Sequence, residues 1–164
     1  MQSYNDLNID YQGGDLLIYS KKLVSLVGCP EVISGGFNCS DNKLASLVGG
    51  PTRVSGYYRC YNNNLTDLVG CASYIGGDLI CWANQITSLI GIHKIIKSCR
   101  GMFFDDCTIT QGGIGLLLIE NLTNISSDGE PFKIIYKYLG QGTKGMMACR
   151  AELISRGYDD YAKL

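Results

Sequence analysis

The chain has 164 residues, of which 46% are hydrophobic, so it is long enough and apolar enough for one folded domain with a core. Its 14 lysines and arginines nearly balance its 15 aspartates and glutamates, and no strong block of one charge occurs. This balance argues against a nucleic acid or an anionic membrane surface as the partner.

The N-terminal segment MQSYNDLNIDYQGG lacks the basic flank and the apolar core of a secretory signal. The chain also contains no apolar run long enough to span a bilayer. We therefore expect a cytoplasmic protein whose thiols stay reduced.

A repeating unit begins at residue 14 and recurs along the chain. Its copies are GDLLIYSKKLVSLVG (14–28), GGFNCSDNKLASLVG (35–49), GYYRCYNNNLTDLVG (56–70) and GDLICWANQITSLIG (77–91), each starting 21 residues after the one before. Cys39, Cys60 and Cys81 occupy one position of successive copies, and no CxxC pair of a zinc site occurs. We interpret these cysteines as small buried core residues, not as disulfides or metal ligands.

The repeat continues after an insertion of two residues. In RGMFFDDCTIT (100–110), the cysteine, asparagine and leucine positions are taken by Phe104, Cys107 and Ile109. A weaker last coil is expected, with its corresponding positions at Leu116, Leu118 and Asn121. The sequence therefore predicts about five stacked turns of chain.

The copies share the pattern φxCxxNxLxxLxG, where φ is apolar, and a further apolar residue precedes each strand position. This pattern resembles the leucine-rich repeat, whose core is LxxLxLxxN/CxL, and Cys107 in place of asparagine matches the N/C alternation. The resemblance implies an α/β repeat solenoid with a short parallel sheet of about five strands. The sequence departs from the family where Ile33 lies four residues, not three, before the strand residue Phe37.

Alternation within each short strand predicts which side chains point into the core. The inward pairs are Phe37 with Cys39, Tyr58 with Cys60, Leu79 with Cys81, and Met102 with Phe104. The asparagines expected to turn the chain and to bond main-chain groups of the neighbouring coil are Asn42, Asn63 and Asn84. The glycines that open and close each copy are expected at tight turns with positive φ.

After residue 125 the sequence changes from repeats to helical spacing. Behind Pro131, one helical face carries Phe132, Ile135, Tyr138 and Leu139. A second helix, KGMMACRAELISR (144–156), presents on one side Met146, Cys149, Leu153 and Ile154. We therefore expect a solenoid at residues 1–125 and a helical C-terminal cap at 126–164. Repeats followed by such a cap resemble the leucine-rich-repeat-like proteins of tailed bacteriophages.

The outward strand positions form the candidate binding surface. Two columns flank the cysteine position: Leu17, Asn38, Arg59, Ile80, Phe103, and then Tyr19, Ser40, Tyr61, Trp82, Asp105; a third column reads Ser20, Asp41, Asn62, Ala83, Asp106. Tyrosine, tryptophan and arginine dominate protein-binding hot spots. The candidate binding residues are Tyr19, Asn38, Arg59, Tyr61, Ile80, Trp82, Phe103, Asp105 and Asp106. The alternative is that the aromatic side chains only cover the sheet through cross-strand contacts.

The sequence offers little that is typical of an enzyme. His93 is the only histidine, and a pair with Cys99 lacks an orienting third group and an oxyanion site. Asp105 and Asp106 point to opposite faces of a strand and make a poor cation site. We expect no catalytic residue, no metal and no cofactor.

The predicted function is a non-catalytic protein-binding module. The resemblance to phage proteins implies that it binds and modulates a bacterial host protein, for example a defence component, in the host cytoplasm. An alternative function is a small-ligand binder, which stacks a nucleotide-like ring on Trp82 and Tyr61 with Arg59 near the phosphate. A homo-oligomer formed through the same face is a third interpretation.

Overall fold

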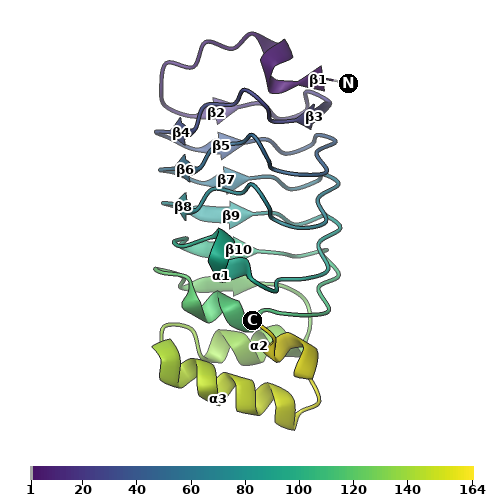
Figure 1. Cartoon of the computed structure of the whole chain (residues 1–164), viewed down its shortest axis with the longest axis vertical. Helices are drawn as coiled ribbons and strands as arrows, with labels where there is room; N and C mark the ends of the chain where they lie inside the picture. Colours follow the sequence, from purple (N-terminus) through teal and green to yellow (C-terminus); the bar gives the residue numbers. More distant parts are fainter. Residues whose placement is uncertain (1) are drawn as a thin grey trace.

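The computed structural model describes residues 2–164, which form an α/β fold with parallel sheets. The described strands are β1 (Gln2–Ser3), β2 (Leu16–Leu17), β3 (Leu23–Ser25), β4 (Val32–Ile33), β5 (Phe37–Asn38), β6 (Arg53–Val54), β7 (Tyr58–Arg59), β8 (Tyr74–Ile75), β9 (Asp78–Ile80), β10 (Gly101–Phe103) and β11 (Asn124–Ser126). The described α-helices are α1 (Ile92–Ile95), α2 (Glu130–Lys137) and α3 (Gly142–Ser155), and the 3-10 helices are η1 (Tyr4–Leu7), η2 (Ile114–Leu118) and η3 (Asp159–Ala162). Successive turns of chain lie one above another (Figure 1).

The main sheet is parallel and has six strands in the order β11-β10-β9-β7-β5-β2. Phe37 pairs with Tyr58 and Tyr58 with Leu79, so the register between these strands equals the sequence period of 21 residues. Leu79 pairs with Met102 across the expected two-residue insertion. Each copy of the repeat therefore contributes one strand to this sheet.

The last turn differs from the expected one. The sequence placed it on Leu116 and Leu118, but these residues belong to η2, and the sixth strand is β11. Met102 pairs with Ile125, which lies 23 residues further on, as Met102 itself does from Leu79. Two consecutive turns are therefore longer than the period, and the last strand lies beyond its predicted position. The sheet consequently has one strand more than the about five expected, and β11 spans the predicted boundary between solenoid and cap.

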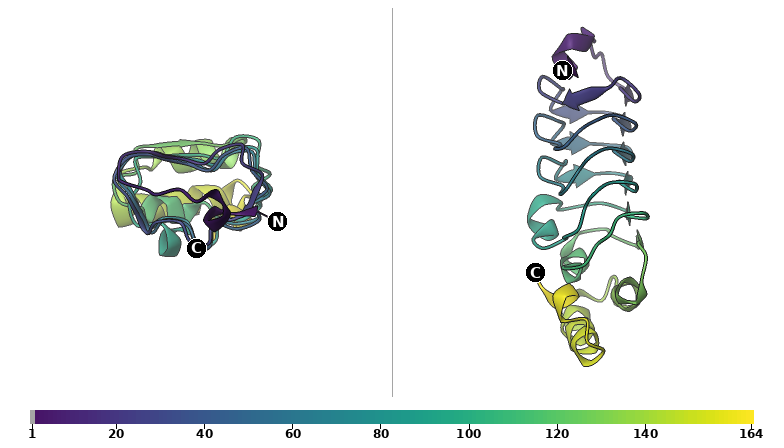
Figure 2. Two further views of the ribbon diagram at one scale, coloured as in Figure 1. Left: turned by 90° about the horizontal axis from the view of Figure 1, so that it is seen from above. Right: turned by 90° about the vertical axis from the view of Figure 1, so that its right-hand side faces the viewer.

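A second parallel sheet, β4-β6-β8, is built from the apolar residues that precede each strand of the main sheet. Ile33 pairs with Val54, and Val54 pairs with Ile75. Seen from above, the turns superpose on a flattened ring with the main sheet along one long side (Figure 2). The apolar residue that precedes each strand of the main sheet thus lies in a short strand of its own, which the sequence analysis did not predict.

The inward pairs predicted from alternation are all fully buried in the space between the two long sides of the ring. The rings of Phe37 and Tyr58 meet edge to face with centroids 4.9 Å apart. All eight cysteines are free and buried, which confirms that the repeated cysteines are core residues.

The repeated asparagines close one corner of each turn. The Asn42 side-chain nitrogen donates hydrogen bonds to the carbonyls of Ile18 and Cys39, both at 2.9 Å, and its oxygen accepts from Leu23 N–H at 2.9 Å. Asn63 and Asn84 repeat this arrangement one and two turns later. The prediction that these amides bond main-chain groups of the neighbouring turn is confirmed, and the bonds supply partners to main-chain groups that are buried at the corner.

Glycine is required at the end of each copy because main chains come close there. Gly70 has a φ of 87°, and a Cβ on it would lie 2.3 Å from the nitrogen of Val48. The closing glycines at the equivalent positions also have positive φ, as predicted. Of the opening glycines, only Gly14 does, so the prediction is wrong for the others. At Gly56, a Cβ would lie 2.8 Å from the nitrogen of Gly36, and close packing is the reason for glycine.

Both ends of the stack are covered. At the N-terminus β1 pairs with β3, and η1 brings Tyr4 into the core; the sequence analysis did not predict this segment. At the C-terminus α2 and α3 pack below the last strands (Figure 1). Glu152 of α3 accepts hydrogen bonds from Lys137 and Tyr138, both at 2.7 Å, which hold the pKa of Glu152 below its ordinary value.

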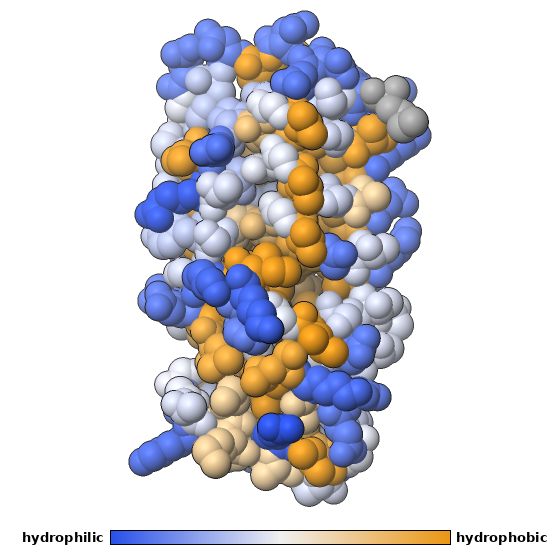
Figure 3. Space-filling model, in the orientation of Figure 1, coloured by the Kyte–Doolittle hydropathy of each residue, from blue (hydrophilic) through white to orange (hydrophobic). Residues whose placement is uncertain are grey.

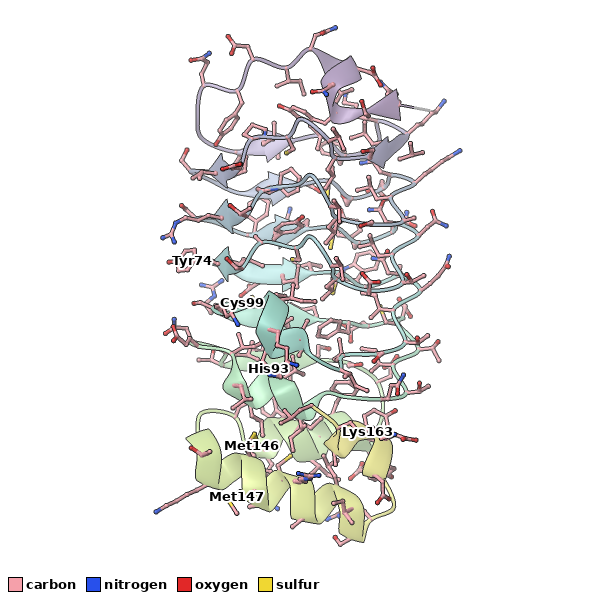
Figure 4. All side chains as sticks on the ribbon, viewed as in Figure 1. Tyr74, His93, Cys99, Met146, Met147 and Lys163 are labelled. Carbon is pink, nitrogen blue, oxygen red and sulfur yellow. The ribbon has the colours of Figure 1, made fainter. Side chains whose placement is uncertain are left out.

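The two predicted C-terminal helices are present, with one side chain misassigned. The predicted inward residues Cys149 and Leu153 are buried, but Ile154 is 46% exposed. Ile154 follows Leu153 directly, and the 100° rotation per residue carries it off the buried side. Met146 lies against the core while the adjacent Met147 projects outward (Figure 4).

Candidate binding face

The outer surface of the main sheet is referred to below as the strand face. It carries the residues that alternate with the buried positions of β2, β5, β7, β9 and β10. From the N-terminal end of the stack to the C-terminal end, this face has three parts. They are a polar cluster around Asp15, an aromatic pair in the middle, and a hollow with apolar walls near β10.

The aromatic pair consists of Tyr61 and Trp82 from adjacent turns. Their rings are stacked, with centroids 4.4 Å apart and planes inclined by only 3°. Trp82 is 36% exposed, and Tyr61 is half-buried. Parallel strands in a 21-residue register place equivalent side chains directly over one another, which is why these two rings meet.

A shallow hollow of about 210 Å³ lies next to this pair, between β9 and β10. Its lining residues are Asp78, Ile80, Trp82, Phe103 and Asp105. Gly101 leaves room for two of them, because a Cβ on it would lie 2.9 Å from both the Asp78 carboxylate and the Phe103 ring. The hollow thus joins apolar walls to two carboxylates.

Both carboxylates of the hollow are held in place by neighbours. Arg100 forms two parallel contacts with Asp78, Nε to Oδ1 at 3.0 Å and a terminal nitrogen to Oδ2 at 3.1 Å. Ser126 donates to Asp105 at 2.5 Å. Arg100, directly before β10, therefore lies at the rim of the hollow.

Arg59 belongs to a separate cluster nearer the N-terminus. Its guanidinium lies over the ring of Tyr57 at 4.3 Å from the centroid, and the Tyr57 hydroxyl donates to Asp15 at 3.0 Å. The Tyr57 ring occupies the space that a Cβ on Gly36 would need. Arg59 is thus engaged with a ring and is not directed at the Tyr61–Trp82 pair as the nucleotide hypothesis required.

Tyr57 and Asp78 form a further outward column that the sequence analysis missed. They lie two residues before Arg59 and Ile80, on the same face of the strands. Outward positions recur every second residue of a strand. The same alternation that identified the other columns therefore also identifies this one, two residues closer to the N-terminus.

The structure separates the remaining predicted site residues. Asn38 was expected to be exposed, but it is only 8% exposed, and its side-chain oxygen accepts hydrogen bonds from Ser40. Tyr19 is exposed near the N-terminal end of the sheet, in the first turn of the stack. Asp106 is exposed at a turn with a φ of 58° and does not line the hollow. Ile80, Trp82, Phe103 and Asp105 are brought together.

His93 and Cys99 belong to different elements, α1 and the segment before β10 (Figure 4). Cys99 is buried and donates to the carbonyl of Gly101 at 3.1 Å, and burial raises the pKa of its thiol to about 11. Burial and the nearby Lys94 and Lys97 lower the pKa of His93. A thiol with this pKa is protonated at neutral pH and is a weak nucleophile.

A second exposed apolar column lies away from the strand face. It is formed at the 21-residue spacing by Val27, Val48, Val69 and Ile90, all exposed. Figure 3 shows apolar side chains in a column along the face that carries α1. The signal in the sequence was the apolar residue directly before each closing glycine, which the analysis left without a role.

In residues 2–164, no α-helix combines the length and the apolar character needed to cross a bilayer. The same part of the chain contains no group of three or more His, Cys, Asp or Glu side chains arranged to hold a metal ion.

No protein-family model, no curated protein and no solved structure gives a significant match to the chain.

Proposed function

We propose that the chain is a leucine-rich-repeat-like solenoid that binds another protein through its strand face without catalysing a reaction. The agreement between the sequence period and the strand register supports the solenoid. The resemblance of the repeats and cap to phage proteins supports a bacterial host protein as the partner, which the phage protein binds and modulates in the host cytoplasm.

The observation that carries the proposal is the hollow beside the Tyr61–Trp82 pair. Trp82, Ile80 and Phe103 supply apolar contact area, and aromatic side chains are the commonest anchors of protein interfaces. Asp105 adds negative charge at the same place, while the charge of Asp78 is balanced by Arg100. This combination suits a protruding lysine or arginine of a partner, whose stem packs on the apolar wall while its charge meets the Asp105 carboxylate and the indole face.

The same charges disfavour the nucleotide alternative. A phosphate near the stacked rings would approach the Asp105 carboxylate of the hollow, and like charges repel. The cation that this alternative assigned to the phosphate, Arg59, lies over Tyr57. The strand face therefore favours a cationic partner group over an anionic one.

The test is affinity capture from a bacterial lysate with the wild-type chain and with the double substitution Tyr61→Ala, Trp82→Ala. The matched control is Val48→Ala, Val69→Ala, which removes exposed apolar side chains from the other column. Urea unfolding curves first show that all three proteins are folded under the conditions of the capture. We expect one specific protein to be captured by the wild type and the control and lost by the Tyr61 and Trp82 variant.

Equal capture by all three proteins would overturn the assignment to the strand face. If the wild type captures no protein but retains a nucleotide in equilibrium dialysis, the small-ligand alternative replaces the proposal. If sedimentation shows a dimer that only the Tyr61 and Trp82 variant loses, the face joins two copies of the chain.

A further inference from the structure

The exposed apolar column runs along the side of the stack that carries α1 (Figure 3). Its four members, Val27, Val48, Val69 and Ile90, are 53%, 55%, 51% and 43% exposed. Each is followed directly by a glycine, so no side chain of the following residue covers it. A continuous row of exposed aliphatic side chains on a folded chain marks an interaction surface.

The spacing of the column is the spacing of the stack. Its members belong to successive turns in the 21-residue register, and neighbouring strands of a parallel sheet lie about 4.8 Å apart. An α-helix laid along the column would present one apolar residue for each turn of about 5.4 Å and would fall out of step. Another column of the same kind stays in step throughout, so the surface fits a second copy of this chain best.

The two ends of the column differ in shape. At the C-terminal end, a hollow of about 150 Å³ is lined by residues that include Val69, Ile90 and, from α1, Ile92 and Ile95. Figure 2 shows α1 outside the ring that the other turns outline, and its turn is two residues longer than the period. The other end, at Val27, has no such helix beside it. Two copies therefore fit best when one is inverted, so that the flat end of each meets the hollow end of the other.

Inversion also brings opposite charges together. It sets Val27 of each copy against Ile90 of the other; Glu31 lies four residues after Val27, and Lys94 lies four residues after Ile90. Each Lys94 thus meets a Glu31, twice in the pair of copies. Both side chains are exposed, and none of the ion pairs described within residues 2–164 includes either one. Copies in parallel would set residues 88–97 against themselves, and this segment contains no carboxylate for the lysine.

The middle of the column is complementary to itself in the same arrangement. The turn of Val48 meets the turn of Val69, so Ser46 of one copy lies opposite Asp67 of the other. Asp67 uses Oδ1 to accept from Val69 N–H at 2.8 Å, and its carboxylate has a second oxygen. The Ser46 hydroxyl oxygen accepts from Val48 N–H at 3.2 Å, and the hydroxyl still has its proton to donate. This serine and this carboxylate are therefore suited to a hydrogen bond between the copies.

We propose that the chain forms a two-fold symmetric dimer in which the apolar columns of two inverted copies pack against each other. The hollow of each copy receives the valines at the flat end of the other, and the Glu31–Lys94 pairs fix the direction. The interface uses the same surface on both copies, so it closes at two. Such a narrow strip covers less than the about 800 Å² per partner of a stable complex, and we expect the dimer to dissociate at about 10 to 100 µM. This inference is independent of the strand-face proposal, because the column lies away from the strand face.

Sedimentation equilibrium of the full chain between about 5 and about 500 µM measures the dimer. Lys94→Glu and Glu31→Lys each place like charges across the interface, and we expect each to weaken association about tenfold. The double substitution Glu31→Lys, Lys94→Glu exchanges the charges, and we expect association within about twofold of the wild type. The matched control is Lys144→Glu, which makes the same change at an exposed residue of α3 and should leave association unchanged.

The apolar contact is tested by Val48→Thr, Val69→Thr, which keeps the shape of the side chains and should weaken association at least about tenfold. The inference is overturned if the wild type stays monomeric at about 500 µM, since the column is then free for a different partner. It is also overturned if the double charge exchange associates as weakly as the single reversals. A third contrary result is a dimer that survives the threonine variant and is lost by Tyr61→Ala, Trp82→Ala, because the strand face would then join the copies.

Discussion

The ring of Trp82 lies flat on the ring of Tyr61, with the two centroids 4.4 Å apart. The two residues are equivalent positions of successive repeats, brought together by the register of β7 and β9. This contact links the period of the sequence directly to the surface that we propose for binding.

Tyr61→Ala is expected to change the environment of Trp82 and leave the fold nearly as stable. The stack is partly exposed, so its loss costs about 1 kcal/mol of the free energy of unfolding. Trp82 is the only tryptophan, so its fluorescence reports this site alone. We expect a red-shifted emission and stronger acrylamide quenching. An unchanged spectrum would show that the rings are not stacked in solution.

Asn63→Ala is expected to lower the free energy of unfolding by about 3 kcal/mol, because the carbonyls of Cys39 and Cys60 and the N–H of Leu44 lose their buried partner. Urea unfolding measures the loss. The control is Asn64→Ala, since the Asn64 side chain is exposed. Equal midpoints for the two variants would mean that the asparagine column does not support the stack.

Cys107→Asn is expected to raise the free energy of unfolding by about 1 kcal/mol. Cys107 occupies the asparagine position of its turn, and its Sγ lies 3.5 Å from the carbonyl of Cys81. The N–H of Ile86 is equivalent to the N–H of Leu65, which donates to the Asn84 side chain. An amide offers two donors and a stronger acceptor there. Cys81→Asn makes the same chemical change at a fully buried strand position, where no such set of partners exists, and should destabilise by about 3 kcal/mol. If both substitutions destabilise equally, the Cys107 position does not offer the hydrogen-bonding partners of the asparagine positions in the other turns.

The free energy of unfolding is expected to fall as the pH rises above about 9. Burial raises the pKa of Cys29 from 9.0 to about 12 and that of Cys149 to about 11. A raised pKa means that the native thiol keeps its proton while the unfolded thiol loses it, so the stabilisation is complete below the unfolded pKa and is lost as the pH rises toward the folded one. Each fully buried thiol weakens folding by at most about 1.4 kcal/mol per pH unit. Urea midpoints at about pH 8 and about pH 10.5 measure the effect, and equal midpoints would show that the native thiols ionise as freely as unfolded ones.

Several elements were predictable because they are local or periodic. Cys39, Cys60 and Cys81 share one repeat position, and each is fully buried as the alternation of the strand predicted. The hydrogen bonds of Asn42 followed from its place at the corner of a turn. Such features depend on the period alone, because every turn meets an almost identical neighbour.

Other features depend on how turns of unequal length meet. The strand β11 was missed because two consecutive turns are two residues longer than the period, which the sequence pattern placed only once. The burial of Asn38 was also missed. Strand alternation predicts that a side chain points away from the core, but it does not predict whether neighbouring side chains cover it.

The sequence by itself determined the stack: the period of 21 residues, the buried cysteines and the asparagine corners all follow from residues at fixed intervals. Only the tertiary structure decided the candidate site. The hollow is formed by residues of two turns of different length, Trp82 and Ile80 on one and Phe103 and Asp105 on the other. It lies where the repeat is interrupted, and a periodic pattern does not specify the shape of the surface at an interruption.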